Sequence, residues 1–227
     1  MKISITKMLT VIALAMLTIL GGCYGSKGPD SKMPLAFEAD FEDGSLDAWS
    51  PTDAAAWRIE DSQGGKVLAL YKQSKYSPPV RSPININLVK DIVVGSFVLD
   101  LKMHSTTKDY GHRDLCLFFG RQDSSHFYYV HIANQSDPHA NSIFIVDGEP
   151  RVSIAEMRTE GTKWDEGWHN IRLVRDVEAG TIQVFFDDMV TPIMTATNDK
   201  FKEGKVGIGS FDDTGQFDDI KLRGVLR

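Results

Sequence analysis

Short apolar segments separated by turn residues recur along the chain from residue 34 onwards. Most are rich in β-branched and aromatic residues and alternate apolar with polar positions, as strands buried on one face do. We predict twelve strands, at 35–41, 57–61, 66–72, 80–86, 96–104, 114–120, 125–133, 142–148, 169–176, 181–188, 205–211 and 217–224. One small sheet does not accommodate so many strands, and the pattern therefore predicts two stacked antiparallel sheets.

Two turns between these strands are specified by their own residues. Asp147-Gly148 favours a tight hairpin, and Glu178-Ala179-Gly180 joins the segments IRLVRD and TIQVFF. Glycine suits such turns because it adopts backbone conformations that other residues avoid. Short helical elements are expected only near 153–165, so the predicted fold class is all-β.

The first 23 residues follow a different pattern. Two lysines precede an apolar run over residues 8–20, which is too short to cross a bilayer comfortably and is typical of a secretory signal. The run ends in Leu-Gly-Gly-Cys, which resembles a bacterial lipobox. The small glycines admit the peptidase, and the Cys23 thiol takes a diacylglycerol. The alternative is an ordinary signal peptide in which Cys23 is incidental.

These patterns divide the chain into three parts. We expect residues 1–22 to be a lipoprotein signal peptide, 23–33 to be the lipidated cysteine and a flexible tether, and 34–227 to form one domain. A lipid anchors a soluble domain to a membrane surface without crossing it. The predicted location is the cell envelope, facing the periplasm if the cell is Gram-negative.

The net charge bears on the choice of binding partner, and the cysteine count bears on disulfide formation. The 25 basic and 31 acidic residues give a net charge of −6, and removal of the two leader lysines makes it −8. A surface of that charge repels nucleic acid, which we do not expect as a partner. Once Cys23 is lipidated, Cys116 remains alone and forms no intramolecular disulfide. Its apolar setting, DLCLFFG, predicts a buried, inert thiol.

Three segments carry a resemblance to a known family. They are DFEDGSLDAWS (40–50), WHNIRLVRDVEAGTIQVFFDD (168–188) and GKVGIGSFDDTGQFDDIKLRG (204–224). In this order and spacing they resemble concanavalin A-like lectin/glucanase jelly rolls, especially the laminin-G-like and 3-keto-disaccharide hydrolase-type domains of secreted bacterial proteins. The resemblance implies a two-sheet antiparallel jelly-roll sandwich in which the first and last strands pair, with a carbohydrate partner.

The sequence departs from this family at two places. Retaining glucanases of the family carry an E-x-D-x-x-E strand motif, which places a nucleophile and an acid on one strand face, and this chain has none. The closing strand also lacks an ending of the L-Q-x-H type. The missing carboxylate motif argues against a glucanase.

The closing strand also suggests a metal. Simple alternation places Asp218 on the same face as Ile220 and Leu222, where its charge is costly unless it is paired or bound to a metal. The resemblance implies a structural Ca²⁺ between the loop of the first strand and an aspartate of the last. Asp218, with Asp40 or Asp43, would supply the oxygen ligands. Alternatively, Asp218 caps nearby backbone N–H groups.

Residues 111–144 hold four of the six histidines. In the strand at 125–133, Tyr129 and His131 share one face with about 7 Å between them. In the preceding strand the Leu115 face belongs between the sheets, and Asp114 lies on the opposite face. The resemblance implies glycan binding on the concave face of the sandwich. The predicted ligand-binding residues are His112, Arg113, Asp114, Tyr129, His131, Asn134 and His139.

Three interpretations of this cluster stay open. Tyr129 and His131 form a sugar-binding ladder, or they act as an acid–base pair in which neutral His131 accepts a proton and Tyr129 returns one, with Arg113 nearby. Polysaccharide lyases of the same fold use similar His/Tyr pairs. The third interpretation is that both side chains merely occupy a half-solvated face.

Other aromatic and histidine residues point less clearly to a site. His126 and His131 are five residues apart and face opposite ways, so only His112, His131 and His139 could meet around a transition metal, and we do not expect such a centre. Trp164 and Trp168 are better explained by packing than as a sugar platform.

The sequence thus supports three functions. The first is a membrane-anchored lipoprotein whose jelly roll binds polysaccharide. The second is a polysaccharide lyase or glycoside hydrolase that uses His131, Tyr129 and Arg113. The third is a structural or assembly lipoprotein whose domain binds other proteins.

Overall fold

The computed structural model of the protein describes residues 33–227. The predicted signal peptide, the lipidated Cys23 and all but the last residue of the tether lie outside the described residues. Within the described part, no helix is long and apolar enough to cross a bilayer.

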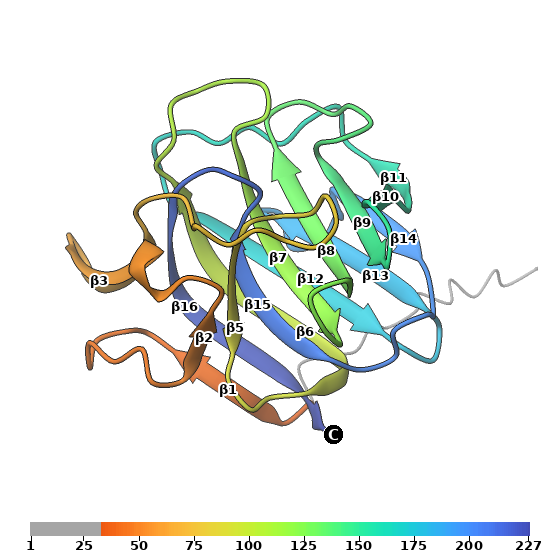
Figure 1. Ribbon diagram of the computed structural model, residues 1–227, viewed down its shortest axis with the longest axis horizontal. Helices are drawn as coiled ribbons and strands as arrows, with labels where there is room; N and C mark the ends of the chain where they lie inside the picture. The colour runs from red at the N-terminus through yellow and green to blue at the C-terminus, as the bar shows by residue number, and fades with distance from the viewer. Residues whose placement is uncertain (1–32) are drawn as a thin grey trace, which may run out of the picture.

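Sixteen strands form two antiparallel sheets that lie one behind the other in Figure 1. The strands are β1 (Leu35–Ala39), β2 (Trp49–Pro51), β3 (Trp57–Ser62), β4 (Gly65–Leu70), β5 (Asn85–Val89), β6 (Val94–Ser105), β7 (Asp114–Arg121), β8 (His126–Ala133), β9 (Ser142–Asp147), β10 (Val152–Ser153), β11 (Ala155–Arg158), β12 (His169–Asp176), β13 (Thr181–Phe186), β14 (Met194–Thr197), β15 (Lys205–Ser210) and β16 (Gly215–Leu226). The nine-stranded sheet has the order β11-β14-β13-β12-β6-β16-β4-β3, with β1 also paired to β16. The seven-stranded sheet has the order β10-β9-β8-β7-β15-β5-β2.

The first and last strands are adjacent, as predicted. β1 pairs antiparallel with β16, and Phe37 lies opposite Leu222. β16 also pairs with β6 and with β4, which places the end of the chain in the middle of the nine-stranded sheet.

The main core fills the space between the two sheets. On β7, Leu115, Leu117 and Phe119 are fully buried there, which confirms the face predicted from alternation. From the other sheet, side chains such as Phe217 and Leu222 of β16 meet them. Burying one such side chain contributes about 1.5–3 kcal/mol, so this layer supplies most of the driving force for folding.

A second apolar layer covers the far side of the seven-stranded sheet. Its buried members are Ile86, Leu88, Cys116, Phe118, Phe127, Tyr129, Phe144 and Val146. Residues 71–84, which connect β4 to β5 and which we call the strap, cross this face in Figure 1. Tyr76 and Val80 of the strap pack against the layer, and Ile84 N–H donates to the Phe211 carbonyl at 3.1 Å. A sheet of this sandwich is therefore covered on both faces.

The predicted hairpin between β12 and β13 forms, whereas the turn at Asp147-Gly148 is wider than the predicted tight hairpin, because residues 146–151 lie between the paired Ile145 and Val152. The β12–β13 hairpin closes with Asp176 opposite Thr181, and Gly180 has a φ of 71°. Gly148, with a φ of 76°, follows β9 and begins the return to β10. Both glycines occupy the left-handed region, which costs other residues about 1–2 kcal/mol.

Several predicted elements differ from the structure. Residues 153–165 contain β11 and irregular chain instead of helix, and the single helical element among residues 33–227 is a 3₁₀ turn at Ala54–Ala56. The strand predicted at 80–86 begins only at Asn85, because the preceding residues belong to the strap. β2, β10, β11 and β14 were not predicted, since strands this short carry too few residues to show a period.

The alternation predicted for the closing strand is wrong. Asp218 lies opposite Lys102 and Lys221 lies opposite Asp100, so β16 advances three residues where β6 advances two. This β-bulge, with Asp219 at a φ of 49°, turns both Phe217 and Ile220 into the core. Asp218 consequently leaves the core face and is half-buried on the outer surface of the sheet.

Candidate functional sites

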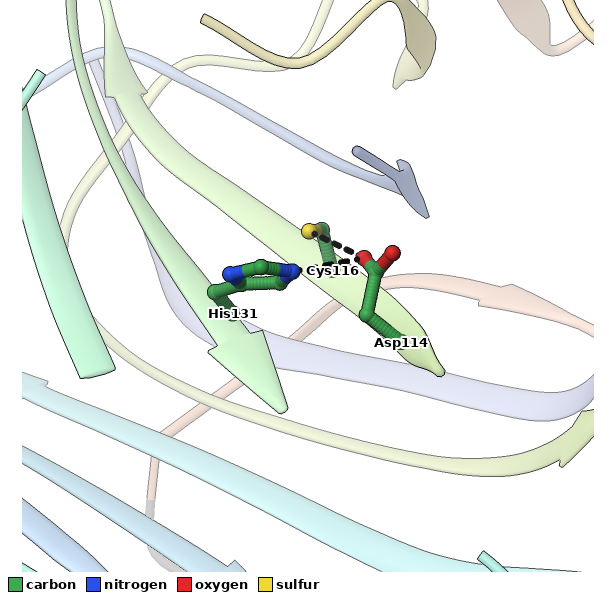
Figure 2. Close-up of side chains that lie close together, drawn as sticks. All are labelled: Asp114, Cys116 and His131. Atoms are coloured by element: carbon green, nitrogen blue, oxygen red, sulfur yellow. Dashed lines mark hydrogen bonds and ion pairs between the residues drawn. The ribbon is translucent and has the colours of Figure 1, made fainter. Parts of the chain in front are cut away.

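Three chemically distinct side chains meet on the strap side of the seven-stranded sheet. Figure 2 shows Asp114 and Cys116, which leave the same face of β7, and His131, which leaves the adjacent strand β8. Cys116 and His131 are direct cross-strand partners, and Asp114 stands two residues before Cys116. All three are buried, with 0, 0 and 3 % of their surface exposed. Rigid strands therefore fix this cluster.

The contacts within the cluster converge on one oxygen. Asp114 Oδ2 lies 3.2 Å from His131 Nε2 and accepts a hydrogen bond from the Cys116 thiol, also at 3.2 Å. It also accepts a hydrogen bond from the Phe211 backbone N–H at 2.8 Å, whereas neither His131 Nε2 nor Asp114 Oδ1 has a hydrogen-bond partner. On the far side of the ring, His131 Nδ1 lies 3.1 Å from the His139 carbonyl. A carbonyl only accepts, so Nδ1 carries the proton of that hydrogen bond.

Two further carboxyl groups adjoin Asp114. Asp213 Oδ2 accepts hydrogen bonds from the Asp114 backbone N–H at 2.8 Å and from the Tyr110 hydroxyl at 2.9 Å. Burial, followed by the nearby charge of Asp114, raises the pKa of Asp213 to about 6. The same two causes raise the pKa of Asp212. One oxygen of each of these three aspartates lies within 4.8 Å of the others.

Tyr129 and His131 do share a face, but both side chains are buried, so this face does not present them to a glycan as predicted. The Tyr129 ring stacks on Phe144 at 5.1 Å between centroids, and no part of its side chain reaches solvent. Burial raises the pKa of its phenol well above the ordinary value, and the hydroxyl has no hydrogen-bond partner. Burial also raises the pKa of the Cys116 thiol, as expected for an inert cysteine. The strap closes this face, which alternation within a strand cannot reveal.

Arg113 does not join His131 and Tyr129. It is 1 % exposed and points toward the nine-stranded sheet, where it donates to the Ser105 hydroxyl and carbonyl at 3.0 and 2.8 Å. It also donates to the carbonyls of Trp164 and Asp165, both at 3.1 Å. The predicted catalytic trio of Arg113, His131 and Tyr129 is therefore not assembled, because successive residues of an extended chain leave opposite faces.

A different arginine lies on the strap side. The Arg151 guanidinium stands 4.2 Å from the centroid of the Phe211 ring, and its Nη2 donates to the His139 carbonyl at 3.3 Å. Its Nε and Nη1 atoms are buried without a hydrogen-bond partner. One feature of the sequence could have placed Arg151 here. The Asp147-Gly148 turn follows β9 and returns the chain beside it, so the residues after the turn lie near the same sheet face.

The remaining predicted ligand residues hold loops together at one end of the sheet. His112 Nε2 pairs with Asp137 Oδ2 at 2.6 Å, and Asp137 Oδ1 accepts from the backbone N–H of exposed His139. Asn134 donates to the Tyr110 carbonyl at 2.9 Å and accepts from the Trp164 N–H, also at 2.9 Å. His112 and His139 belong to no metal-holding group with His131 among the residues the structure describes.

A separate hollow lies on the outer face of the nine-stranded sheet. It has a volume of about 750 Å³ and is bounded by β4, β6, β16 and the approach to β12. We call it the Trp168 hollow, because the half-buried indole of Trp168 forms part of its wall, 5.5 Å from the His104 ring between centroids. Its lining residues are Asp40, Glu42, Ser62, Gln63, Gly64, Val67, Lys102, His104, Glu166, Trp168, Gln216, Asp218 and Asp219.

Planar polar groups and carboxylates are set around that indole. Gln216 Oε1 lies 3.1 Å from His104 Nδ1, and its amide nitrogen donates to Glu60 at 2.9 Å. Lys102 pairs with Asp219 at 2.7 Å, and this hydrogen bond raises the lysine pKa. Burial raises the pKa of Asp218. Trp168 was predicted to serve packing. Its place in the wall of a hollow depends on β6 and β16, which are distant in sequence and come to lie beside it only in the folded chain.

The predicted calcium ligands do not all lie together. Asp40 and Asp218 line the same hollow, but Asp43 does not, and its Oδ1 accepts from the Ser45 N–H at 2.8 Å. Asp218 Oδ1 accepts from the Asp219 N–H at 2.8 Å, which is the capping alternative. Among the residues that the structure describes, two groups of side chains lie close enough together to hold a metal ion. Both groups include Asp114, and neither includes Asp218. Calcium at Asp218 stays a prediction.

Comparison with known proteins identifies the fold. No family model matches the chain, and no curated protein matches it. Among solved structures, the carbohydrate binding module CBM66 from Bacillus subtilis is 16 % identical, covering 78 % of this chain and 96 % of that one, with a TM-score of 0.54. Domain 4 of AbnA, a GH43 extracellular arabinanase from Geobacillus stearothermophilus in complex with arabinotriose, is 11 % identical over 86 % and 94 %, with a TM-score of 0.57.

A plant lectin has the same arrangement. Winged bean acidic lectin, complexed with methyl-α-D-galactose, is 14 % identical over 84 % of this chain and 99 % of that one, with a TM-score of 0.57. The fold is a lectin-like jelly-roll sandwich. The shared architecture confirms the predicted fold class. Sequence identities this low establish the architecture alone and do not establish a function.

Proposed function

We propose that this chain is a carbohydrate-binding domain and that the Trp168 hollow receives the saccharide. The observation that carries the proposal is a half-buried indole set beside planar hydrogen-bonding groups in a hollow of about 750 Å³. Ligand sites commonly have volumes of about 300–1,000 Å³. The fold is also that of a carbohydrate binding module and a lectin, which supports the same function by analogy.

The chemistry of the hollow suits a sugar. A pyranose or furanose ring presents C–H groups on its faces and hydroxyls around its edge. The Trp168 indole offers an apolar surface to the C–H groups, while the Gln216 amide and the Asp218 carboxylate are placed to bond the hydroxyls. Two of these groups stand on β16, so the site rests on a strand in the middle of the sheet.

Charge narrows the class of saccharide. The lining contains five carboxylates, those of Asp40, Glu42, Glu166, Asp218 and Asp219, against the single ammonium of Lys102. Lys102 is already paired with Asp219. An anionic glycan would be repelled, and the hollow therefore favours a neutral saccharide or an amino sugar.

A glycan panel tests the proposal. The purified domain is screened against neutral, amino and anionic polysaccharides, and the binders are measured by calorimetry for the parent, Trp168→Ala and Trp168→Phe. Loss of a stacking group costs about 1–3 kcal/mol, so we expect Trp168→Ala to bind about 10- to 100-fold more weakly and Trp168→Phe to retain most affinity. The matched control is Tyr71→Ala, which removes an exposed aromatic ring outside the hollow.

Two outcomes would overturn the assignment. If Trp168→Ala binds its glycan with unchanged affinity, the saccharide does not bind in the Trp168 hollow. If no class of glycan binds to the parent, the domain is not a carbohydrate-binding domain. The second result would favour the assembly-lipoprotein hypothesis. The lyase or hydrolase hypothesis has less support, because Arg113 points away from Tyr129 and His131 and both of those side chains are buried.

We further propose that the domain is displayed at a membrane surface by its lipidated Cys23. The support is the lipobox-like sequence and the tether that follows it. Several tethered copies facing one polysaccharide bind together more strongly than a single free copy. Binding by several copies at once would compensate for a modest affinity of each Trp168 hollow for the saccharide.

A further inference from the structure

The cluster of Asp114, Cys116 and His131 contains an electrostatic conflict. His131 donates its Nδ1 proton to the His139 carbonyl, and a neutral imidazole has no second proton. Its Nε2 lone pair therefore faces Asp114 Oδ2 at 3.2 Å, an oxygen that is also an acceptor. Two buried acceptors repel each other at that distance unless a positive charge, either a proton or a metal ion, lies between them.

We propose that this positive charge is a zinc ion, held by Asp114, Cys116 and His131. The site lies on the opposite sheet from the Trp168 hollow and does not depend on the proposed carbohydrate function. His112 and His139 are not ligands of this centre. It therefore differs from a site formed by His112, His131 and His139, which the sequence did not lead us to expect.

The spacing of the ligand atoms fits tetrahedral zinc. Zinc bonds of about 2.0–2.3 Å to oxygen, nitrogen and sulfur place neighbouring ligand atoms about 3.3–3.6 Å apart in a tetrahedron. Asp114 Oδ2 lies 3.2 Å from both His131 Nε2 and Cys116 Sγ, and all three atoms lie within 4.8 Å of one another. Small side-chain rotations bring them to bonding distance of a common point.

The surroundings orient the ligands as a metal requires. A metal-bound histidine usually donates its other ring N–H to a carbonyl or carboxylate, and the His139 carbonyl plays that part here. The Phe211 N–H fixes the Asp114 carboxylate, and the direct pairing of Cys116 with His131 fixes their separation. Asp114 Oδ1 is buried without a partner and is free to share in binding.

The donor set selects zinc over calcium or magnesium. Thiolate and imidazole are soft ligands, which hard cations avoid and zinc accepts. The Cys116 proton leaves on binding, since zinc takes the thiolate. The three side chains leave one position of the tetrahedron open, and the exposed Asp212 carboxylate belongs with Asp114 and Asp213 to a separate, neighbouring group.

The test uses the full chain carrying Cys23→Ser, so that Cys116 is the only thiol. Metal-free protein is titrated with Zn²⁺ by calorimetry and with Co²⁺ by absorption spectroscopy. We expect one ion per chain, a raised melting temperature, proton release and a near-ultraviolet thiolate-to-cobalt band. Adding Cys116→Ser should abolish the band, and His131→Gln should weaken Zn²⁺ binding at least about tenfold.

His126→Gln is the matched control. His126 lies on the same strand but pairs with Asp123, away from the cluster, so its loss should leave binding unchanged. The proposal is overturned if the parent binds no stoichiometric Zn²⁺, or if bound Co²⁺ gives no thiolate band. These two measurements use only the parent, so they decide the question even if a buried variant fails to fold. Their failure would assign the positive charge to a proton held between His131 Nε2 and Asp114 Oδ2.

Discussion

Replacing Arg113 by methionine removes the four hydrogen bonds that its buried guanidinium donates between the two sheets. Methionine has a similar length and fills the same apolar space, so the change isolates the polar contribution. The Ser105, Trp164 and Asp165 carbonyls lose their donor. The nearest carboxylate, Glu166, stands 3.7 Å away and is 92 % exposed, so it adds little to the attraction.

The magnitude follows from these contacts. A hydrogen bond from a charged donor contributes about 1.5–3 kcal/mol, and a buried acceptor left alone costs about 1–3 kcal/mol. Because methionine avoids the cost of burying a charge, we expect a net loss of about 3–5 kcal/mol from a total stability of about 5–15 kcal/mol. The melting temperature should fall by roughly 6–20 °C for a domain of this size.

Chemical denaturation of the parent, Arg113→Met and Arg113→Lys measures the effect. Lysine keeps the charge but reaches fewer of the acceptors, so its loss should be intermediate. Arg58→Met is the surface control, since the Arg58 side chain is 54 % exposed, pairs with Glu60 and stacks on the exposed Tyr71 ring; it should cost under about 1 kcal/mol. A loss below about 1 kcal/mol in Arg113→Met, with an unchanged denaturant slope, would refute the structural role assigned to Arg113.

Further predictions concern the chain ends and calcium. Deleting residues 217–227 should abolish cooperative unfolding, because it strips the strand between β6 and β4; a truncated chain that melts like the parent would contradict the topology. Adding Ca²⁺ to metal-free protein should raise the melting temperature, and Asp218→Ala should remove that response; an indifferent parent would dispose of the calcium site. Mass spectrometry of protein from bacterial membranes should find a diacylglyceryl group on Cys23, and Cys23→Ser should release the protein from the membrane fraction.

Local features were predictable because neighbouring residues decide them. The β12–β13 hairpin depends on Gly180 and on the apolar runs beside it, all within twenty residues. Alternation also placed Leu115 in the core and Asp114 on the opposite face, since successive side chains of a strand leave opposite sides. A chemical centre was expected in the histidine stretch, and Asp114 and His131 do meet there. Cys116 was expected to be buried and inert, and its part in a polar cluster was missed.

Contacts between residues distant in sequence decided the positions of several side chains that the hydrophobic pattern could not predict. The bulge at Asp218 and Asp219 exchanges the predicted faces of Phe217 and Asp218, while Ile220 and Leu222 keep the face predicted for them, because β16 has an extra residue there against β6. Arg113 was expected near His131, but its partners come from β6 and from the chain before β12. Trp168 became part of a hollow only because β6 and β16 lie beneath it.

The sequence by itself determined that this protein is a two-sheet β sandwich and which side chains of β7 and β8 share a face. It did so because strand periodicity and turn chemistry are local properties of the chain. Only the tertiary structure decided that the strap buries Tyr129 and His131 while the opposite sheet keeps a hollow open. Whether a polar face meets solvent depends on which distant segment packs over it. The local pattern of residues 71–84, part of which predicted a strand, does not tell where that segment will lie.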